Sequence, residues 1–484
     1  MSSTREAPEQ YDLIALGSGE GGKSIAWHYS STHGKRCAVI EHQWYGGSCP
    51  NVACMPSKTV LWMAKLVHHA TTLGERLGIG TNSAVVMHAV LQRKREMIEG
   101  QIGLHRNLFE SSGAEMVWGR GKLVGPKIVE VSDGQGVVRV MRSEVIVICT
   151  GSEAVVPNIT GLKEAKPLTH VGLLELEELP QHLIILGGGY VGLEFAQGMR
   201  RFGAKVTLVE HNERILKRED KDVSALMQQV LEREGVTVLT STTLNSVSGS
   251  SGKIVTLKGK NTASNMPITI TGSHILCAAG RTANTSNLGL DLAGVKLTEA
   301  GFVAVDEHLQ TSAPGIFATG DCAGSPQFTH MGFDDFRIVR DNLTGSGKGG
   351  TASNQSSNRR SARQVPSTLF TDPQLAHVGL REHEAKAQGM SYRLAQVPMS
   401  AFLKTHTMAS EGETTGFARV LISNKDDTIL GFTAIGVEAG ELLPVVQLAM
   451  QKSLTYMDVA ELIIVHPTFN EGLTYLFNAV PSRT

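Results

Sequence analysis

The sequence has little of what marks a membrane protein, a nucleic-acid-binding protein or a disulfide-stabilised protein. Its 484 residues carry 45 Lys and Arg against 46 Asp and Glu, so the formal net charge of −1 favours neither nucleic acid nor an anionic membrane as partner. No apolar run approaches the ~18 residues that a membrane span needs. Six cysteines do not make a disulfide scaffold in a chain this long, and they fit a reducing compartment. The first ten residues are polar and resemble neither a signal nor a transit peptide, so we expect a cytoplasmic protein.

Length and composition indicate a globular protein of several domains. At about 150 residues per domain, the chain is long enough for roughly three. The apolar content of 41% and the charged content of 19% are ordinary for a protein with a sizeable core.

Two cysteines, Cys49 and Cys54, are separated by four intervening residues. Pro50 suits the first turn of a helix, where its missing N–H costs nothing. Because a helix dipole stabilises a thiolate there, we expect these thiols to be more acidic than free cysteine, and one helical turn apart they can close and reopen a disulfide. The alternatives are two buried structural cysteines or half of a metal site. Zinc would need a second ligand pair at similar spacing, which the sequence lacks, so we expect no resident metal.

A glycine-rich turn follows the first predicted strand, residues 11–16. Gly17, Gly19 and Gly22 form a G-x-G-x-x-G motif before a helical segment, and the next strand ends in Glu41, nineteen residues after Gly22 (41 − 22). The glycines allow a pyrophosphate to approach a helix N-terminus, and the carboxylate takes a ribose hydroxyl. Strand, glycine turn, helix and acid together predict a dinucleotide site.

The same pattern recurs 170 residues later (187 − 17). A strand at 183–186 leads into Gly187, Gly189 and Gly192, and the following strand, 205–209, ends in Glu210. Because both copies are intact, we favour two nucleotide cofactors over one domain duplicated with a decayed copy.

The rest of the chain supplies further strands and a change of pattern. Apolar runs at 145–148 and 316–318 end in glycine turns, and Asp321 follows the second; an acid there can bind a ligand in the crevice, or can be an ordinary turn residue. We predict a helix over 86–112 and short strands over 116–131. From 365 onward the pattern is α+β, with strands at 417–423 and 429–437 and a helix at 441–451.

Together these motifs resemble the FAD-dependent pyridine nucleotide-disulfide oxidoreductases, which include dihydrolipoamide dehydrogenase, glutathione reductase and mercuric reductase. The resemblance covers nearly the whole chain. Residues 47–54 look like the redox box G-T-C-x-N-x-G-C, with Ser48 for Thr and Ala53 for Gly. Other segments resemble the A-T-G, G-R, FAD-ribityl and H-P-T-x-x-E motifs of the family: Thr150-Gly151-Ser152, Gly280-Arg281, Thr319-Gly320-Asp321 and His466-Pro467-Thr468 with Glu471.

The resemblance implies an α/β fold with two Rossmann-like dinucleotide-binding domains, for FAD and for NAD(P), and a C-terminal α+β dimerisation domain. We place the FAD-binding domain at 1–160 with a second part at 282–344, the NAD(P)-binding domain at 161–281, a flexible linker at 345–364 and the interface domain at 365–484.

The resemblance also implies residue roles at the flavin. Cys54 would face the flavin and form the charge-transfer thiolate, and Cys49 would be the interchange thiol that attacks substrate. Lys58 and Glu194 would pair beside the flavin N5, and Tyr190 would cover the flavin until nicotinamide displaces it. The implied FAD-binding residues are Gly17, Gly19, Gly22, Glu41, Gly47, Ser48, Lys58, Gly121, Thr150, Gly151, Asp321 and Thr329. The implied NAD(P)-binding residues are Gly187, Gly189, Tyr190, Gly192, Glu194, Glu210 and Gly280.

The acid–base pair of this resemblance is His466 with Glu471. A histidine with a near-neutral pKa, held by a carboxylate, is well suited to take and return the proton of an attacking thiol. His466 would come from the partner subunit, so the active site would exist only in a homodimer.

The nucleotide and the substrate are less constrained. Glu210 favours NADH, because a carboxylate accepts from a free 2′-OH and repels a 2′-phosphate. Three basic residues follow Glu210 closely, however: His211, Arg214 and Lys217. Because a cation can bind a 2′-phosphate, NADPH remains the alternative nucleotide.

For the substrate we weigh a small disulfide against a thiol-bound soft metal ion. Residues 328–330 and 334–339 look most like a mercuric-reductase-like branch, and soft thiolates favour Cu(I) and Hg(II). No cysteine follows Cys322, so the C-terminal pair of mercuric reductases is absent. Ile464 replaces the first His of the His-Ala-His-Pro-Thr of dihydrolipoamide dehydrogenases. The alternatives are a dihydrolipoamide dehydrogenase proper, a flavin-mediated nicotinamide transhydrogenase and a slow-turnover flavin redox sensor.

Overall fold

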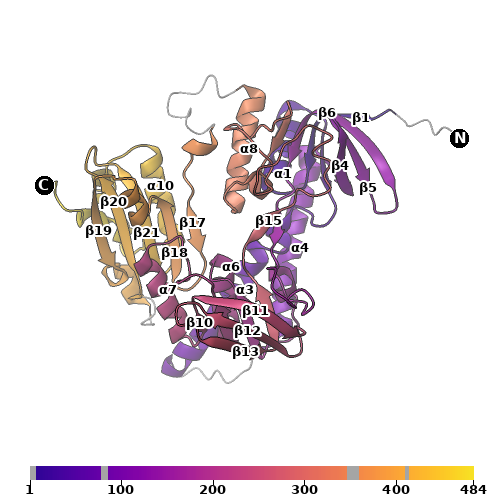
Figure 1. Cartoon of the computed structure of the whole chain (residues 1–484). Coiled ribbons are helices and arrows are strands. Elements are labelled where there is room, and N and C mark those ends of the chain that lie inside the picture. The colour runs from indigo at the N-terminus through magenta and orange to yellow at the C-terminus, as the bar shows by residue number, and fades with distance from the viewer. Residues whose placement is uncertain (1–6, 78–84, 346–358, 409–413, 484) are drawn as a thin grey trace. The chain divides into compact units, whose positions relative to one another are not determined.

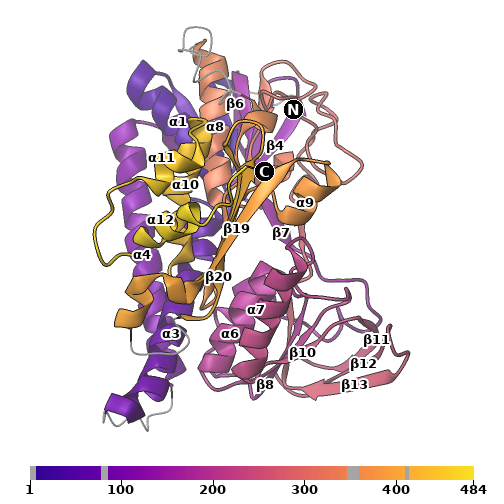
Figure 2. The same ribbon diagram turned by 90° about the vertical axis from the view of Figure 1, so that its left-hand side faces the viewer.

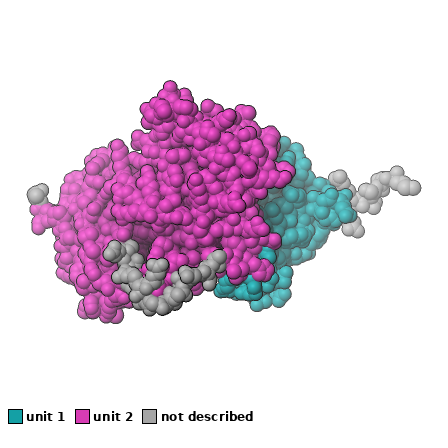
Figure 3. Space-filling view, turned by 90° about the horizontal axis from the view of Figure 1, so that it is seen from below, with its two compact units in different colours: residues 1–57, 92–154, 281–363 teal, residues 58–91, 155–280, 364–484 magenta. Residues whose placement is uncertain are grey.

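The computed structural model describes residues 7–77, 85–345, 359–408 and 414–483. The chain divides into two compact units, and each unit is assembled from three separate stretches of sequence (Figure 3). Unit 1 comprises 1–57, 92–154 and 281–363, and unit 2 comprises 58–91, 155–280 and 364–484. Within the described part of the chain, no helix is both long and apolar enough to cross a lipid bilayer.

Unit 1 is built on a seven-stranded sheet in the order β3-β2-β1-β6-β5-β4, with β16 also paired to β6 (Figure 1). β1 runs parallel to β2 and β6, and its apolar residues are buried, as a central parallel strand requires. The long β6 also pairs antiparallel with β5. The strands are β1 (Glu9–Leu16), β2 (Cys37–Glu41), β3 (Glu115–Trp118), β4 (Arg120–Gly125), β5 (Ile128–Ser132), β6 (Val137–Ile148) and β16 (Ile316–Ala318), with a separate pair formed by β7 (Ser152–Ala154) and β15 (Arg281–Ala283).

Two helices far apart in the sequence, α1 (Glu20–His33) and α8 (Thr329–Thr344), lie together on this sheet (Figure 1). Leu13 of β1, Ile25 of α1 and Phe336 of α8 share one buried apolar cluster. Packing thereby places the N-termini of both helices near the carboxyl ends of the parallel strands. The smaller elements of unit 1 are α2 (Ser48–Asn51), η1 (Gly320–Ala323) and η4 (Arg360–Ala362), while α3 (Cys54–Leu77) and α4 (Met87–Ser112) have residues in both units.

The predicted linker at 345–364 falls mostly on residues 346–358, which lie outside the described residues. At its end, η4 is part of unit 1, and Arg363 pairs with the buried carboxylate of Asp335 on α8.

The first part of unit 2 repeats the strand–turn–helix arrangement of unit 1. Its four-stranded parallel sheet has the order β10-β9-β8-β14. One face packs against α6 and α7, and the other packs against a three-stranded antiparallel sheet, β11-β12-β13 (Figure 2). The elements are α5 (His170–Leu173), β8 (His182–Leu186), α6 (Tyr190–Arg201), β9 (Lys205–Val209), α7 (Lys221–Arg233), β10 (Thr237–Leu239), β11 (Thr242–Gly249), β12 (Val255–Asn261), β13 (Pro267–Gly272) and β14 (His274–Cys277).

The C-terminal part of unit 2 is a five-stranded antiparallel sheet, β17-β18-β21-β20-β19, with α10, α11 and α12 on one face (Figure 2). The predicted strands at 417–423 and 429–437 correspond to β20 and β21. The predicted helix at 441–451 begins instead with the 3-10 turn η8, and α10 starts only at Leu443. Pro444 lies in the first turn of α10, where the backbone N–H that proline lacks would have no partner within the helix. The elements are β17 (Ser367–Leu369), β18 (Gln374–Gly379), α9 (Glu382–Ala387), β19 (Tyr392–Pro398), η5 (Met399–Ala401), η6 (Leu403–Thr407), β20 (Phe417–Ser423), β21 (Ile429–Gly436), η8 (Ala439–Leu442), α10 (Leu443–Gln451), α11 (Tyr456–Ala460) and α12 (Glu471–Asn478).

Candidate active site

Cys49 and Cys54 lie on two successive helices. Cys49 is on the single-turn α2, and α3 begins at Cys54. The side-chain amide of Asn51, the last residue of α2, donates to the carbonyls of Tyr45 (2.9 Å) and Gly47 (2.7 Å), which ties α2 to the segment that precedes it. The prediction that the two cysteines lie one turn apart on a helix is wrong, because α2 ends at Asn51 and α3 begins only at Cys54.

Both cysteines are thiols in this structure. A hydrogen bond with Cys54 and burial raise the pKa of Cys49, whereas Thr329 and Lys23 act to lower it. The prediction of unusually acidic thiols is therefore wrong for Cys49. A helix of one turn has too small a dipole to outweigh a neighbouring thiol. Sγ of Cys54 lies 3.1 Å from Oγ1 of Thr329, the first residue of α8.

The first dinucleotide turn connects β1 to α1. A Cβ on Gly17 would lie 2.4 Å from the carbonyl oxygen of Cys149, and one on Gly22 would lie 2.7 Å from the carbonyl oxygen of Gly17, so both positions require glycine. Gly19 is the N-cap of α1, and no side chain in the described part of the chain caps that helix. The first-turn N–H groups of α1 thus fit the pyrophosphate of a dinucleotide.

Glu41 is buried at the end of β2 and is held by the glycine turn. Its Oε2 accepts hydrogen bonds from N–H (3.0 Å) and Oγ (2.7 Å) of Ser18, and its Oε1 accepts from N–H of His42 (2.8 Å) and Gln43 (2.9 Å). These hydrogen bonds fix the carboxylate beside the first dinucleotide turn. Gly47 packs against this turn, since its Cβ would lie 3.0 Å from Cα of Gly19.

The carboxyl ends of β6 and β16 carry a second polar group of unit 1. Asp321 accepts a hydrogen bond from Ser152, and Arg281 donates to Oγ of Ser152 at 2.7 Å. Burial raises the pKa of Asp321. The adjoining turn is fixed by Asp335, a fully buried residue of α8 that accepts from N–H of Gly320 at 2.6 Å.

Other predicted FAD-binding residues of unit 1 have structural contacts of their own. Thr150 donates through Oγ1 to the carbonyl of Asn284 at 2.7 Å, and Gly151 has a positive φ of 68°. Gly121 lies in β4, where a Cβ would be 2.8 Å from the side chain of Leu16. Ser48 is the first residue of α2.

The second dinucleotide turn, between β8 and α6, has the same physical basis as the first. A Cβ on Gly187 would lie 2.5 Å from the carbonyl oxygen of Ala278, and one on Gly192 would lie 2.0 Å from that of Gly187. At Gly189, the N-cap of α6, a Cβ would meet no described atom within 4 Å. Open space in front of a helix N-terminus fits a nucleotide pyrophosphate. Gly280 also faces open space and has a φ of 116°.

Glu210 directly follows β9 and is buried. Its Oε2 accepts from N–H of Gly188 at 2.7 Å, and its Oε1 accepts from N–H (2.8 Å) and Nδ2 (2.5 Å) of Asn212. Arg214 is one of the three basic residues that left NADPH as an alternative nucleotide. Its Nη2 donates to the carbonyls of Lys217 (2.7 Å) and Glu219 (3.2 Å). The structure therefore gives Arg214 a role in shaping this loop.

Lys58 and Glu194 form the predicted pair within unit 2. Nζ of Lys58 lies 2.9 Å and 2.7 Å from the two carboxylate oxygens of Glu194. Phe370 supports both, because its N–H donates to Glu194 at 3.0 Å and its ring centroid lies 4.7 Å from Nζ of Lys58. The hydroxyl of Tyr190 lies 3.3 Å from Oγ of Ser367, and burial raises the pKa of Tyr190 to about 12, so it remains a neutral phenol.

His466 and Glu471 also meet, at the start of α12. Nδ1 of His466 lies 2.9 Å from Oε1 of Glu471, and the imidazole is largely exposed, at 64%. The hydrogen bond with His466 lowers the pKa of Glu471. Exposed apolar residues surround the motif, with Ile463 fully exposed and Val465 75% exposed.

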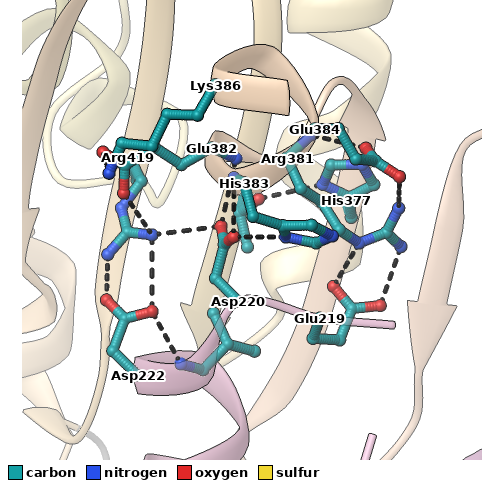
Figure 4. Close-up of polar contacts among 12 residues, drawn as sticks. Glu219, Asp220, Asp222, His377, Arg381, Glu382, His383, Glu384, Lys386 and Arg419 are labelled. Carbon is teal, nitrogen blue, oxygen red and sulfur yellow. Dashed lines mark hydrogen bonds and ion pairs between the residues drawn. The ribbon is translucent and has the colours of Figure 1, made fainter. Parts of the chain in front are cut away.

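A further ion-pair cluster in unit 2 joins the start of α7 to α9 and β20 (Figure 4). Asp220 accepts from the ring of His383 at 2.6 Å, and Glu219 forms a two-pronged pair with Arg381 at 2.7 and 2.8 Å. Arg419 of β20 pairs with Asp222. The cluster fixes the segment that follows the Glu210 loop.

Sequence reasoning missed several residues that hold the predicted ones in place. Ser18 lies inside the glycine motif and could have been found as a small hydrogen-bonding residue in that turn. Asn212 lies two residues after its partner Glu210, so a local turn contact could have pointed to it. No local pattern distinguishes the other three, because each reaches its partner through tertiary folding. The missed residues are Ser18, Lys23, Asn212, Asp335 and Phe370.

Comparison with known proteins agrees with this arrangement. The family model described as pyridine nucleotide-disulphide oxidoreductase matches residues 11–335, and the model of the dimerisation domain of that family matches residues 365–476. The probable pyridine nucleotide-disulfide oxidoreductase RclA of Escherichia coli is 30% identical over 475 residues, covering 97% of this chain and 99% of the relative. The mitochondrial dihydrolipoyl dehydrogenase of Dictyostelium discoideum is 31% identical (96% and 93% covered), and the mercuric reductase of Staphylococcus aureus is 30% identical (96% and 81% covered).

Solved structures show the same likeness. The Cu(II) complex of the HOCl-induced flavoprotein disulfide reductase RclA from Escherichia coli has a TM-score of 0.85 and 30% identity, over 97% of this chain and 99% of that one. LpdA from Mycobacterium tuberculosis, at 23% identity and a TM-score of 0.84 with the same coverage, shares the fold.

Two dinucleotide-binding turns, a pair of adjacent thiols and a C-terminal interface domain define a flavin- and nicotinamide-dependent oxidoreductase. The chain belongs to the pyridine nucleotide-disulfide oxidoreductase family, and it uses FAD and NAD(P)H. The predicted α/β fold and the predicted dimerisation domain are confirmed.

Proposed function

We propose that this enzyme passes electrons from NADH through FAD and a Cys49–Cys54 disulfide to a small disulfide substrate. The observation that carries the proposal is the contact between the two thiols, with Cys54 also held against Thr329 at the N-terminus of α8. Bound FAD supplies the two-electron chemistry that links a nicotinamide hydride to thiol–disulfide exchange.

In the proposed reaction, the thiolate of Cys49 attacks one sulfur of the substrate disulfide, forming a mixed disulfide and releasing the other sulfur as a thiolate. His466 of the partner subunit gives that thiolate its proton. The thiolate of Cys54 then attacks the sulfur of Cys49, which releases the second substrate thiol and re-forms the Cys49–Cys54 disulfide. One disulfide is reduced and one dithiol is oxidised.

The homodimer with shared active sites is supported by the exposure of the His466 motif. An imidazole held by Glu471, next to the exposed apolar side chains of Ile463 and Val465, is the surface expected where a second copy of the chain packs. We further propose the segment limits given above, with FAD-binding parts at 1–160 and 282–344, an NAD(P)-binding part at 161–281 and an interface domain at 365–484, and a cytoplasmic location in which thiols stay reduced.

NADH as electron donor is supported by Glu210. Its carboxylate is buried and fixed by Gly188 and Asn212, where a free ribose 2′-hydroxyl can donate to it and a 2′-phosphate is repelled. The backbone hydrogen bonds of Arg214 leave that guanidinium less available to a phosphate.

A thiol-bound soft metal ion is the second candidate substrate. Relatives are named mercuric reductase, and one related structure is a Cu(II) complex. For this chain, two adjacent thiols suit reduction of a soft ion delivered as a thiol complex.

The deciding experiment measures NADH oxidation by the holoenzyme with a panel of small disulfides and with thiol-complexed Cu(II) or Hg(II). We expect turnover with a disulfide and its loss in Cys49→Ser, with Cys277→Ser, a buried thiol of unit 2, as the matched control. Turnover with metal complexes alone supports the second candidate. Full activity in Cys49→Ser indicates nicotinamide transhydrogenation, and a reducible flavin without any turnover indicates a sensor; either result contradicts the proposal.

A further inference from the structure

We propose that Lys23 is a positioning residue of the redox loop, whose buried ammonium anchors the turn before Cys49 and favours the thiolate of that cysteine. The inference rests on the proposed role of Cys49 as the attacking thiol.

Lys23 belongs to the first turns of α1 but is directed away from solvent, with its side chain only 3% exposed. Nζ donates to the carbonyl oxygen of Gly46 at 2.9 Å and lies 2.9 Å from Oε2 of Glu20. The ring centroid of Trp27, one turn further along α1, is 5.9 Å from Nζ. A buried ammonium is costly to desolvate unless it is paired and hydrogen-bonded, and here it is both.

The turn that Lys23 holds is the one that presents Cys49. Gly46 and Gly47 both have a φ of 86°, and Gly47 is the N-cap of α2, whose second residue is Cys49. Lys23 therefore ties the helix that follows the first dinucleotide turn to the loop that carries the attacking sulfur. A one-ångström shift of that turn moves the sulfur by a comparable distance, enough to impair its attack.

The charges around Cys49 give this lysine an electrostatic effect as well. Contact with Cys54 and burial raise the pKa of Cys49, and the positive charge of Lys23 acts against both. Glu20 is 24% exposed and therefore better screened by water than the buried ammonium. His105 of α4 packs against Gly46, and burial together with Lys23 lowers its pKa, so at neutral pH it adds no charge of its own.

The test uses FAD-loaded, reduced enzyme in a Cys54→Ser background, so that alkylation by iodoacetamide at the redox loop reports Cys49 alone. The alkylation rate of Cys49 is measured against pH, with the modified peptide identified by mass spectrometry. In Lys23→Met we expect the midpoint pH to rise, which lowers the rate at pH 7 by at least about threefold, about half a pKa unit. In Glu20→Gln, which removes the opposing charge, we expect the midpoint to fall.

Opposite shifts distinguish an electrostatic role from simple disordering of the loop, which would move both variants in the same direction. Lys35→Met removes one positive charge from a half-exposed lysine after α1, and it should leave the midpoint unchanged. An unchanged midpoint in Lys23→Met with normal FAD content overturns the proposal, as does a shift of the same sign in both charge variants. If Cys49→Ser keeps full disulfide reductase activity, the proposed function fails instead, whatever Lys23 does to the thiol.

Discussion

Nδ1 of His466 lies 2.9 and 3.0 Å from the two carboxylate oxygens of Glu471. One nitrogen of the imidazole is therefore bound to the carboxylate, and in the proposed reaction Nε2 would exchange a proton with a substrate thiol. Both residues lie in unit 2, so a single chain assembles the pair. The hydroxyl of Tyr475 also donates to Glu471, at 3.2 Å.

Replacing the acid–base residue tests the proposed role of this pair. We expect His466→Gln to lower kcat for disulfide reduction by about 100-fold, because proton transfer to the leaving thiolate is lost. Glu471→Gln should lower kcat by a smaller factor, since it disturbs only the orientation of the imidazole. The melting temperature and FAD content of His466→Gln should equal those of the wild type, because His466 is largely exposed. His88→Gln, at an exposed position of α4, is the control, and wild-type kcat in His466→Gln would contradict the assignment.

Glu210 should determine the choice of nicotinamide nucleotide. In Glu210→Ala the acceptor for the ribose 2′-hydroxyl and the repulsion of a 2′-phosphate are both lost, so the ratio of kcat/KM for NADH to that for NADPH should fall at least tenfold, about 1.4 kcal/mol. Glu213→Ala removes an exposed carboxylate from the same loop and serves as the control. An unchanged ratio in Glu210→Ala would show that other groups select the nucleotide.

The two glycines Gly189 and Gly192 should respond differently to alanine. At Gly192 the new Cβ would lie 2.0 Å from the carbonyl of Gly187, so Gly192→Ala should lower the melting temperature. At Gly189 the Cβ meets open space and φ is −91°, so Gly189→Ala should fold normally but raise KM for NADH, because the methyl group occupies the place of the pyrophosphate. Thermal melting and steady-state kinetics check both. A normal KM in Gly189→Ala would argue against nucleotide binding there.

Acid stability should depend on Asp220 in the cluster of Figure 4. Burial raises the pKa of this carboxyl, but hydrogen bonds from the ring and N–H of His383 and from N–H of Glu382 outweigh burial, and the net pKa is lowered. The ionised group thus contributes stability above its unfolded pKa of about 3.8, and this is lost as the pH falls through the folded value.

Asp220→Asn should therefore lower the melting temperature at pH 7, and the gap to the wild type should narrow as the pH falls below about 4. Asp291→Asn, at an exposed turn, is the control. A gap that is constant from pH 7 to pH 3 would mean that the charge of Asp220 is not what stabilises the cluster.

Local pattern was sufficient for much of the site. Gly17, Gly22, Gly187 and Gly192 stand where backbone contacts leave no room for a Cβ, and such positions are marked in the sequence by the residue type alone. The pairing of His466 with Glu471 also follows from spacing, because the two residues lie at the end of a loop and the start of one helix.

The pKa of Cys49 could not be predicted from local sequence pattern. The dipole argument assumed a helix of ordinary length, whereas α2 has four residues and places Cys49 against Cys54. A pKa depends on the neighbours that surround a sulfur in space, and here those neighbours include Thr329 and Lys23, which are distant in sequence.

By itself, the sequence determined two glycine-rich strand–helix turns, a cysteine pair, the closely spaced His466 and Glu471, and an α+β C-terminal domain, because each is set by residue types at short spacing. Only the tertiary structure decided that Asp335 fixes the turn at Gly320, that Phe370 supports Lys58 and Glu194, and that Lys23 anchors the turn before Cys49. These contacts join segments whose approach depends on how helices and sheets pack, and close packing is a property of the whole fold.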